Sequence, residues 1–170
     1  GSTNQIKLSN LSFSGFATGL NFLSHTYRVS MENCVFIHSI FNAVRTQSNI
    51  SDVFEGMDFS NCAFIDGGAL LFETSTGIFN FYTCSFDNTK VDLSGGSTTL
   101  NFFGGHFENP GSGGVGYDGF IGVYGSSNAV HLMGTTWTFN QTFDVTIPPV
   151  AGGGGYQSSS SVILDGVNLP

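Results

Sequence analysis

Apolar and polar residues recur in the same order in seven short segments of the chain. Each segment holds a hexamer that starts with an apolar residue and has Asn, Thr or Gly in third place: LSNLSF (8–13), MENCVF (31–36), FSNCAF (59–64), FYTCSF (81–86), FFGGHF (102–107), LMGTTW (132–137) and LDGVNL (164–169). The third residues stand at positions 10, 33, 61, 83, 104, 134 and 166, so the unit repeats every 21 to 32 residues. We interpret this spacing as one coil of about 20 residues that carries insertions of variable length.

The segment around the start of each hexamer predicts a β-strand. Two positions upstream of each hexamer stands a second apolar residue: Ile6, Val29, Met57, Phe79, Leu100, Val130 or Val162. The residue between the two apolar positions is mostly polar: Lys7, Ser30, Asp58, Asn80, Asn101, His131 or Ile163. Because successive side chains of a strand point to opposite faces, this alternation predicts one buried face in every unit.

The third residue of each hexamer predicts a bend that leads into a second strand. Asn and Gly tolerate left-handed backbone angles, and an Asn side chain can hydrogen-bond the local backbone. Beyond the bend lies a column that contains the three cysteines, and then an almost wholly aromatic column: Phe13, Phe36, Phe64, Phe86, Phe107, Trp137 and Leu169. A third apolar strand follows in GLNFL, GALLF, KVDL, GFIGVY and FDVTI.

Equivalent residues at one period indicate that the units stack along an axis. The pattern therefore predicts an all-β fold, a parallel β-solenoid of about seven coils whose strands lie about 4.8 Å apart. Cys34, Cys62 and Cys84 would form an internal ladder of small buried thiols. An odd number of cysteines without a CxxC pair argues against a zinc site or a disulfide framework.

The hexamers MENCVF and FSNCAF resemble the strand–Asn bend–strand corner of the pectate-lyase-like superfamily. The stretch 11–36 is similar to a coil of phage tailspike or tail-appendage proteins. This resemblance covers residues 6–170, and it implies a right-handed single-stranded parallel β-helix in a homotrimer on a phage tail, outside the host cell. It implies binding, and often cleavage, of a bacterial surface polysaccharide such as capsule, O-antigen or exopolysaccharide. Residues 1–5 look like a tag remnant and lead-in, and we expect the β-helix to be part of a longer chain.

The composition excludes some partners. The formal net charge is −8 and only four residues are Lys or Arg, so the cations that displace counterions from nucleic acid are missing. The same shortage disfavours an anionic membrane surface, and no apolar run reaches the roughly 20 residues of a membrane-spanning helix. No sequence motif for a metal or a cofactor is present, so we expect neither.

Carboxylate chemistry on sugars is the remaining catalytic hypothesis. In the predicted register, Glu32 and Asp58 lie on adjacent coils and are offset by two residues, which puts their backbones about 8 Å apart. Two acids separated by roughly 6.5–9.5 Å suit inverting glycoside hydrolysis. The alternative is an ordinary solvated acidic surface. The register places neither Arg28 nor Arg45 beside stacked acids.

Next to these acids, the outward column places Tyr82, Phe103 and Met133 in a row. Exposed apolar rows mark interaction sites. The rings, flanked by Asn80, Asn101 and His131, would bind sugar, or else the row would form the interface of a trimer. His131 has the alternative of an ordinary hydrogen-bonding surface role.

Three stretches read as insertions: 40–52, 108–119 and 148–161. The two later ones set Tyr117 and Tyr156 among Gly and Ser, which suits adaptable binding loops with an aromatic anchor. The alternative is flexible surface or packing against a neighbouring chain. The sequence thus favours a domain that binds, and as a further hypothesis hydrolyses, a bacterial surface polysaccharide. A non-catalytic receptor-binding or structural shaft module of a virion fibre is the second hypothesis.

Overall fold

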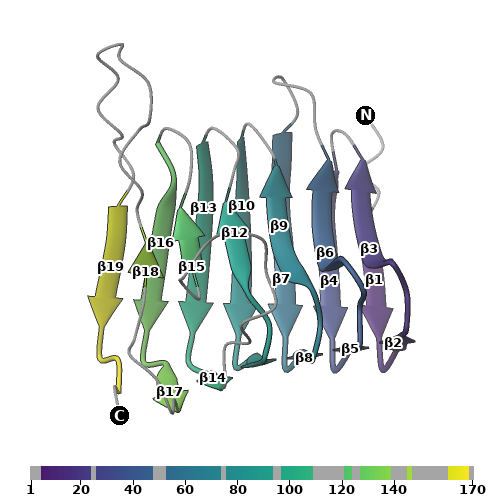
Figure 1. Ribbon diagram of the computed structural model, residues 1–170. Helices are drawn as coiled ribbons and strands as arrows, with labels where there is room; N and C mark the ends of the chain where they lie inside the picture. Colours follow the sequence, from purple (N-terminus) through teal and green to yellow (C-terminus); the bar gives the residue numbers. More distant parts are fainter. Residues whose placement is uncertain are drawn as a thin grey trace, which may run out of the picture.

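Three parallel β-sheets run the length of the molecule in a computed structural model (Figure 1). The structure describes residues 5–23, 26–47, 53–73, 76–93, 97–108, 121–123, 127–138, 145–146 and 161–168. All strand pairs among these residues are parallel, and consecutive strands of each sheet come from consecutive coils. The predicted parallel β-helix is therefore confirmed.

The first sheet, sheet A, holds one strand from each of the seven coils. Its strands are, in spatial order, β1 (Ile6–Ser9), β4 (Tyr27–Glu32), β7 (Val53–Ser60), β10 (Thr76–Tyr82), β13 (Ser97–Phe103), β16 (Ala129–Met133) and β19 (Ser161–Asp165). The pairing joins the predicted columns in register, for example Ser30 with Asp58 and Met31 with Phe59. The alternating pattern of the sequence thus fixed both the faces and the register of this sheet.

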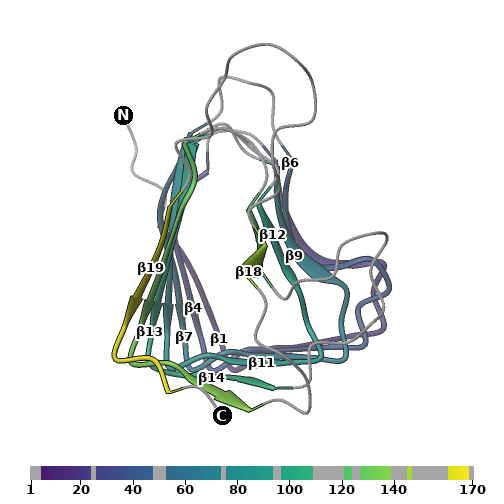
Figure 2. The ribbon, with the colours of Figure 1, turned by 60° about the vertical axis from the view of Figure 1, so that its left-hand side comes forward.

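The other two sheets complete each coil, and Figure 2 shows how the three sheets surround a common interior. Sheet B contains β2 (Ser12–Ser14), β5 (Val35–Ile37), β8 (Ala63–Ile65), β11 (Ser85–Asp87), β14 (His106–Glu108) and β17 (Thr136–Thr138). Sheet C contains β3 (Thr18–Leu23), β6 (Asn42–Gln47), β9 (Ala69–Glu73), β12 (Val91–Leu93), β15 (Ile121–Val123) and β18 (Val145–Thr146).

Sheet C corrects one sequence-based expectation. The stretch 40–52 is not wholly an insertion, because residues 42–47 form β6 between β3 and β9. Its apolar residues Ala43 and Val44 are fully buried. The sequence hid this strand because Asn42, Arg45 and Gln47 interrupt the apolar alternation on which the prediction relied.

The bends between sheets A and B lie where the third hexamer residues predict them. All seven have positive φ angles between 51° and 64°: Asn10, Asn33, Asn61, Thr83, Gly104, Gly134 and Gly166. A second column of left-handed residues lies between sheets B and C, with φ angles of 45° to 70°: Gly15, His38, Asp66 and Asn88. The sequence analysis missed this second column because its four residue types share no visible pattern.

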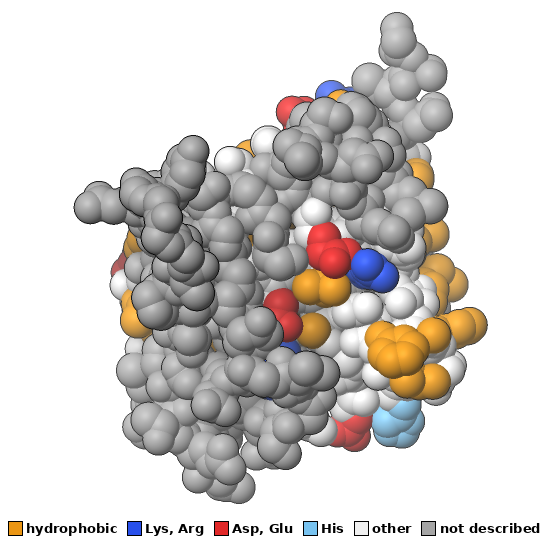
Figure 3. Space-filling model, turned by 45° about the horizontal axis from the view of Figure 1, so that its top comes forward, with side chains coloured by type: hydrophobic (Ala, Val, Ile, Leu, Met, Phe, Trp, Pro, Cys, Tyr) orange, Lys and Arg blue, Asp and Glu red, His pale blue; other side chains and the backbone are white. Residues whose placement is uncertain are grey.

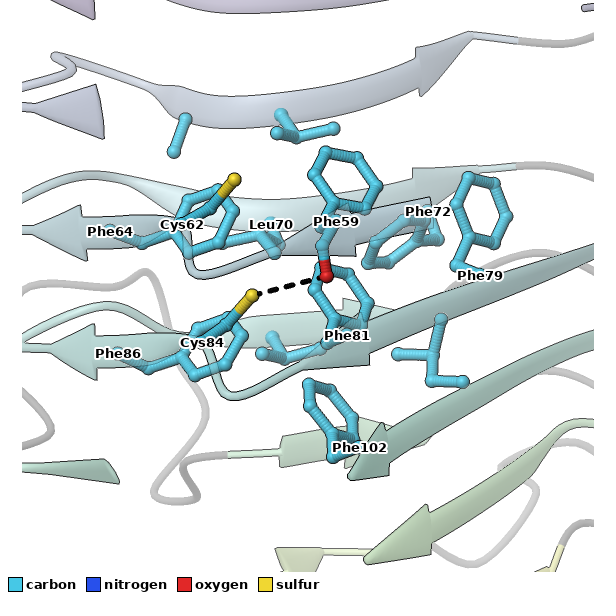
Figure 4. Packing of buried hydrophobic residues seen from close by; sticks show 14 of the residues in the cluster. Phe59, Cys62, Phe64, Leu70, Phe72, Phe79, Phe81, Cys84, Phe86 and Phe102 are labelled. Carbon is cyan, nitrogen blue, oxygen red and sulfur yellow. Dashed lines mark hydrogen bonds between the residues drawn. The ribbon is translucent and has the colours of Figure 1, made fainter. Parts of the chain in front are cut away.

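Aromatic ladders fill the interior. One ladder runs Phe13–Phe36–Phe64–Phe86–Phe107–Trp137, with ring centroids 4.2–5.0 Å apart and planes within 18° of parallel. A second stacked ladder runs Phe59–Phe81–Phe102 and meets the first edge to face. Figure 4 shows both ladders beside Cys62 and Cys84. Stacking puts each large ring on an equivalent ring one coil away, so the core repeats with the coil.

The cysteines occupy the corner inside the first bend. Their exposed fractions are 0%, 1% and 2% for Cys34, Cys62 and Cys84. Each thiol lies within hydrogen-bonding distance of two carbonyls, one two residues earlier and one in the preceding coil; Cys84 Sγ, for instance, lies 3.6 Å from Tyr82 O and 3.4 Å from Phe59 O. All three are free thiols, so they cap backbone carbonyls and pack as core.

Gly105 continues the cysteine column at a point where the backbones of two coils lie very close together. Its φ is +80°, and a Cβ on it would lie 2.1 Å from Cys84 O. We predict that Gly105→Ala lowers the free energy of unfolding by about 2–4 kcal/mol, since a left-handed penalty adds to a backbone clash. Urea denaturation followed by circular dichroism measures this loss.

Gly134→Ala is the matched control. Gly134 is also left-handed, with φ +63°, but a Cβ there meets nothing within 4 Å. Its expected cost is about 1 kcal/mol, the conformational penalty alone. Equal costs for the two variants would contradict the proposed close approach at Gly105.

Candidate functional site

The outer face of sheet A carries every sequence-predicted site residue that the structure describes. Two outward columns cross this face in register. One contains Lys7, Ser30, Asp58, Asn80, Asn101, His131 and Ile163. The other contains Ser9, Glu32, Ser60, Tyr82, Phe103, Met133 and Asp165. Tyr117 and Tyr156 lie outside the described residues.

Glu32 and Asp58 lie on adjacent strands with the predicted two-residue offset, because Glu32 pairs with Ser60 and Asp58 with Ser30. Each has a polar partner. Lys7 Nζ lies 3.3 Å from Glu32 Oε2, with the Glu32 side chain 44% exposed. Asp58 Oδ1 accepts a hydrogen bond of 2.8 Å from Asn80 Nδ2. The two acids are thus neighbours on one solvent-facing surface.

The amide residues form a hydrogen-bonded ladder with Asp58. Asn101 Nδ2 donates to Asn80 Oδ1 at 2.9 Å, and Asn80 donates onward to Asp58. His131 pairs with Asn101 in the register and is partly exposed. The ladder fixes the orientation of the Asn80 amide and turns one oxygen of Asp58 toward it. Polar groups that are held in this way need little reorganisation when they meet a ligand.

Tyr82 and Phe103 stack on each other. Their ring centroids are 5.0 Å apart and their planes differ by 8°. One face of Tyr82 is therefore covered by Phe103, while its opposite face points along the sheet toward the strand of Ser60. Tyr82 is 39% exposed. The rings thus do not form the flat sugar platform that a simple row of exposed aromatics suggests.

Ser60 is the short side chain between two long ones in its column. Glu32 flanks it on β4 and Tyr82 on β10. Two strand spacings separate these flanking residues by about 9.6 Å. We call Glu32, Asp58, Ser60, Asn80 and Tyr82 together the Ser60 subsite. The subsite combines one open aromatic face, two carboxylates and an oriented amide. Ser60 itself was not among the residues that the sequence predicts for the site.

Sheet C carries a second charged surface that the sequence analysis missed. Arg45 Nε and Nη2 lie 2.8 and 2.7 Å from Glu73 Oε2, so Arg45 pairs with a single acid. The sequence analysis did not find this pair because it read the stretch that contains β6 as an insertion. Asp92 lies on β12, opposite Leu71 of β9. Burial raises the pKa of Asp92, and Lys90 partly opposes this rise. Figure 3 shows acidic, basic and hydrophobic side chains together on this side of the molecule.

A third polar cluster lies on the sheet B strands β11 and β14, next to the second bend column. Burial, then Glu108 and Asp66, raise the pKa of Asp87. Ser85 Oγ lies 3.1 Å and Glu108 Oε2 3.8 Å from His106 Nε2. Both groups thus approach the same ring nitrogen. In a serine–histidine–acid triad the acid instead orients Nδ1, so this cluster lacks that geometry.

Within the described ranges, no group of three or more His, Cys, Asp or Glu residues is arranged to hold a metal ion. The same ranges contain no helix long and apolar enough to cross a membrane. The three thiols are at most 2% exposed, which closes them to reagents in solution. Burial raises the pKa of Cys34, and within the hydrogen-bonded Cys62–Cys84 pair the pKa of Cys84 is raised and that of Cys62 is lowered. The side chains available for chemistry at the sheet surfaces are thus carboxylates, amides, aromatic rings and the Lys, Arg and His residues described above.

Comparisons with protein-family models, with curated proteins and with solved structures find no match to this chain.

Asp92 makes stability depend on pH in a defined direction. A carboxyl whose pKa is higher in the folded state binds its proton more tightly there, so stability falls as pH rises from the ordinary Asp value, about 3.9, through the raised value. We predict that Asp92→Asn removes this fall and makes the protein more stable than the parent at pH 7. Urea midpoints measured at pH 4 and pH 7 test this. A larger advantage of the variant at pH 4 would contradict the assignment.

Proposed function

We propose that this protein binds an extended polysaccharide across the outer face of sheet A, with one sugar ring seated at the Ser60 subsite. The observation that carries this proposal is the open face of Tyr82 above Ser60, with Glu32 on the other side. The spacing of about 9.6 Å between the flanking strands suits one ring inserted edge-on. Stacking on the aromatic face would supply apolar contact, and the carboxylates and amide would bind hydroxyl groups.

The regular repeat of the sheet supports an extended ligand. Asn101 and His131 continue the polar column beyond Asn80, one strand at a time. Phe103 and Met133 continue the apolar column in parallel. A polymer that lies across the strands would therefore meet a polar and an apolar position on each of β10, β13 and β16. This arrangement favours a chain of sugars over a single small molecule.

The identity of the polysaccharide is inferred from the sequence. The stretch 11–36, which resembles a coil of phage tailspike proteins, and the scarcity of Lys and Arg support a bacterial surface polysaccharide as ligand and a virion tail as location. The homotrimer implied by the same resemblance stays a prediction. A structural shaft, in which the Tyr82–Phe103 stack is buried between chains, is the competing function, and binding measurements separate the two.

Hydrolysis at the same subsite is the catalytic part of the proposal. Glu32 and Asp58 keep the two-residue offset that separates their backbones by about 8 Å. One carboxyl group would protonate the glycosidic oxygen while the other, as carboxylate, takes a proton from the attacking water.

We predict that Tyr82→Ala weakens polysaccharide binding at least tenfold, and that Ser60→Phe abolishes it by occupying the space above Ser60. Ser60 faces outward, so the added ring should leave the core intact. The measurement is calorimetric titration with purified capsular, O-antigen and exopolysaccharides. Ser12→Phe on the exposed face of sheet B is the matched control and should bind like the parent. Binding that survives Ser60→Phe would refute the subsite.

For hydrolysis, we predict that Glu32→Gln and Asp58→Asn each lower the release of reducing ends by at least 100-fold while binding changes less than threefold. Reducing-end assays on whichever polysaccharide binds measure this. Full turnover in both variants would remove these acids from the mechanism. Binding without turnover in the parent would leave a receptor-binding module.

A further inference from the structure

Strand β4 contains a left-handed arginine. Arg28 has a φ angle of 55°, and the residue after it, Val29, is buried in the core. A positive φ angle is uncommon for a residue with a long side chain, because its Cβ crowds the backbone. Among the described residues, Arg28 is the only left-handed non-glycine residue that lies inside a strand. Such an outlier motivates the search for a function at this position.

A left-handed glycine, Gly56 with a φ angle of 64°, lies next to Arg28 on the neighbouring strand β7. The two residues directly follow the register pair Tyr27–Glu55. A Cβ on Gly56 would lie 3.5 Å from Arg28 Cα and 3.6 Å from Arg28 Cγ, so the start of the Arg28 side chain lies close to Gly56. The missing side chain of Gly56 thus leaves room for the arginine.

The backbone irregularity is a β-bulge that turns an extra residue outward. Between β7 and β10 the register shifts at this point. Glu55 and Gly56 are both exposed between the buried Phe54 and Met57, where strict alternation allows one outward residue. Ile78 of β10 stands opposite the bulge and is 49% exposed. We call the following residues the bulge site: Tyr27, Arg28, Glu55, Gly56 and Ile78.

Arg28 is an exposed cation without an acidic partner in an acidic protein. The chain has four Lys and Arg residues and a formal net charge of −8. The Arg28 guanidinium forms no ion pair or hydrogen bond within the part of the chain that the structure describes. Its N–H donors are therefore available to a ligand. The other three cations each lie near a carboxylate, in the pairs Lys7–Glu32, Arg45–Glu73 and Lys90–Asp92.

The side chains around Arg28 define the kind of ligand that fits. A guanidinium binds a carboxylate through two parallel hydrogen bonds, a pairing that a hydroxyl group does not offer. Tyr27 is 43% exposed and Ile78 faces outward, so both present apolar surface to a sugar ring. Glu55 lies between these two strands and repels a second carboxylate. The bulge site thus suits a sugar whose carboxylate points toward Arg28.

We propose that the bulge site binds a carboxylate-bearing sugar, such as a uronic acid, with Arg28 holding the carboxylate. The inference rests on the proposed polysaccharide binding and narrows its ligand to an acidic polysaccharide. Arg28 precedes Glu32 by four residues of β4, which is about 13 Å of strand. The acidic sugar is therefore a different unit of the polymer from the sugar at the Ser60 subsite.

The test compares each polysaccharide with its own carboxyl-reduced form. Bacterial polysaccharides that contain uronic acids are titrated calorimetrically, both native and after chemical reduction of their carboxylates to primary alcohols. For the polymer that binds, the native form should bind at least tenfold more tightly than the reduced form. Equal affinities, or binding of neutral polysaccharides alone, would overturn the inference and leave polysaccharide binding in place. A protein that binds no polysaccharide, neutral ones included, would reject both.

Arg28→Gly is the decisive variant. Glycine adopts a positive φ angle without strain, so the variant should fold like the parent, which urea denaturation verifies. Its affinities for the native and the reduced polymer should become equal. Arg28→Lys should keep only part of the preference, because an ammonium group lacks the paired donors of a guanidinium.

Lys90→Gln is the control for net charge. It removes the same single positive charge from sheet C and should keep the full preference for the native polymer. An equal loss of preference in Lys90→Gln and Arg28→Gly would trace the effect to net charge and overturn the assignment to the bulge site.

Glu55→Gln should act in the opposite direction. Removing the like charge beside the bound carboxylate should raise the affinity for the native polymer by about threefold and leave that for the reduced polymer unchanged. Weaker binding of the native polymer by Glu55→Gln would contradict a carboxylate at this site.

Discussion

The stacking of one coil on the next is the interaction on which the rest of this structure depends. Parallel strands about 4.8 Å apart place each inward side chain on its counterpart in the neighbouring coil. That distance lies within the range of centroid separations of offset-stacked aromatic rings, and Phe36, Phe64 and Phe86 stack with centroids 5.0 Å apart. One spacing thereby satisfies the backbone hydrogen bonds and fills the core.

The corners follow from the same spacing. A bend must turn the chain without disturbing the register, and the left-handed residues of the first bend do so in all seven coils. Inside that bend, small side chains such as the Cys84 thiol fit against carbonyls of their own coil and of the preceding one. Where Gly105 replaces the cysteine, the neighbouring backbone comes too close for any side chain. The core therefore limits which residues can stand at each corner.

The outer surface gains its chemistry from the repeat. Columns that the core holds in register place Asp58, Asn80 and Asn101 in one hydrogen-bonded line and stack Tyr82 on Phe103. The interruption of that regularity by Ser60 makes the face of Tyr82 available to a ligand. The proposed ligand site thus lies where the repetition of the outward columns is broken.

The sequence by itself determined the coil number, the register of sheet A, the first bend and the aromatic columns. These features follow from the alternation of apolar and polar residues along each strand and from the return of the same hexamer pattern in every coil. It also placed Glu32 and Asp58 on neighbouring strands. Only the tertiary structure decided that residues 42–47 form a strand, that Arg45 binds Glu73 and that Tyr82 offers one face. These three features depend on the directions of side chains and on the second bend. At that bend His38, Asp66 and Asn88 adopt the same left-handed backbone conformation although their side chains differ chemically.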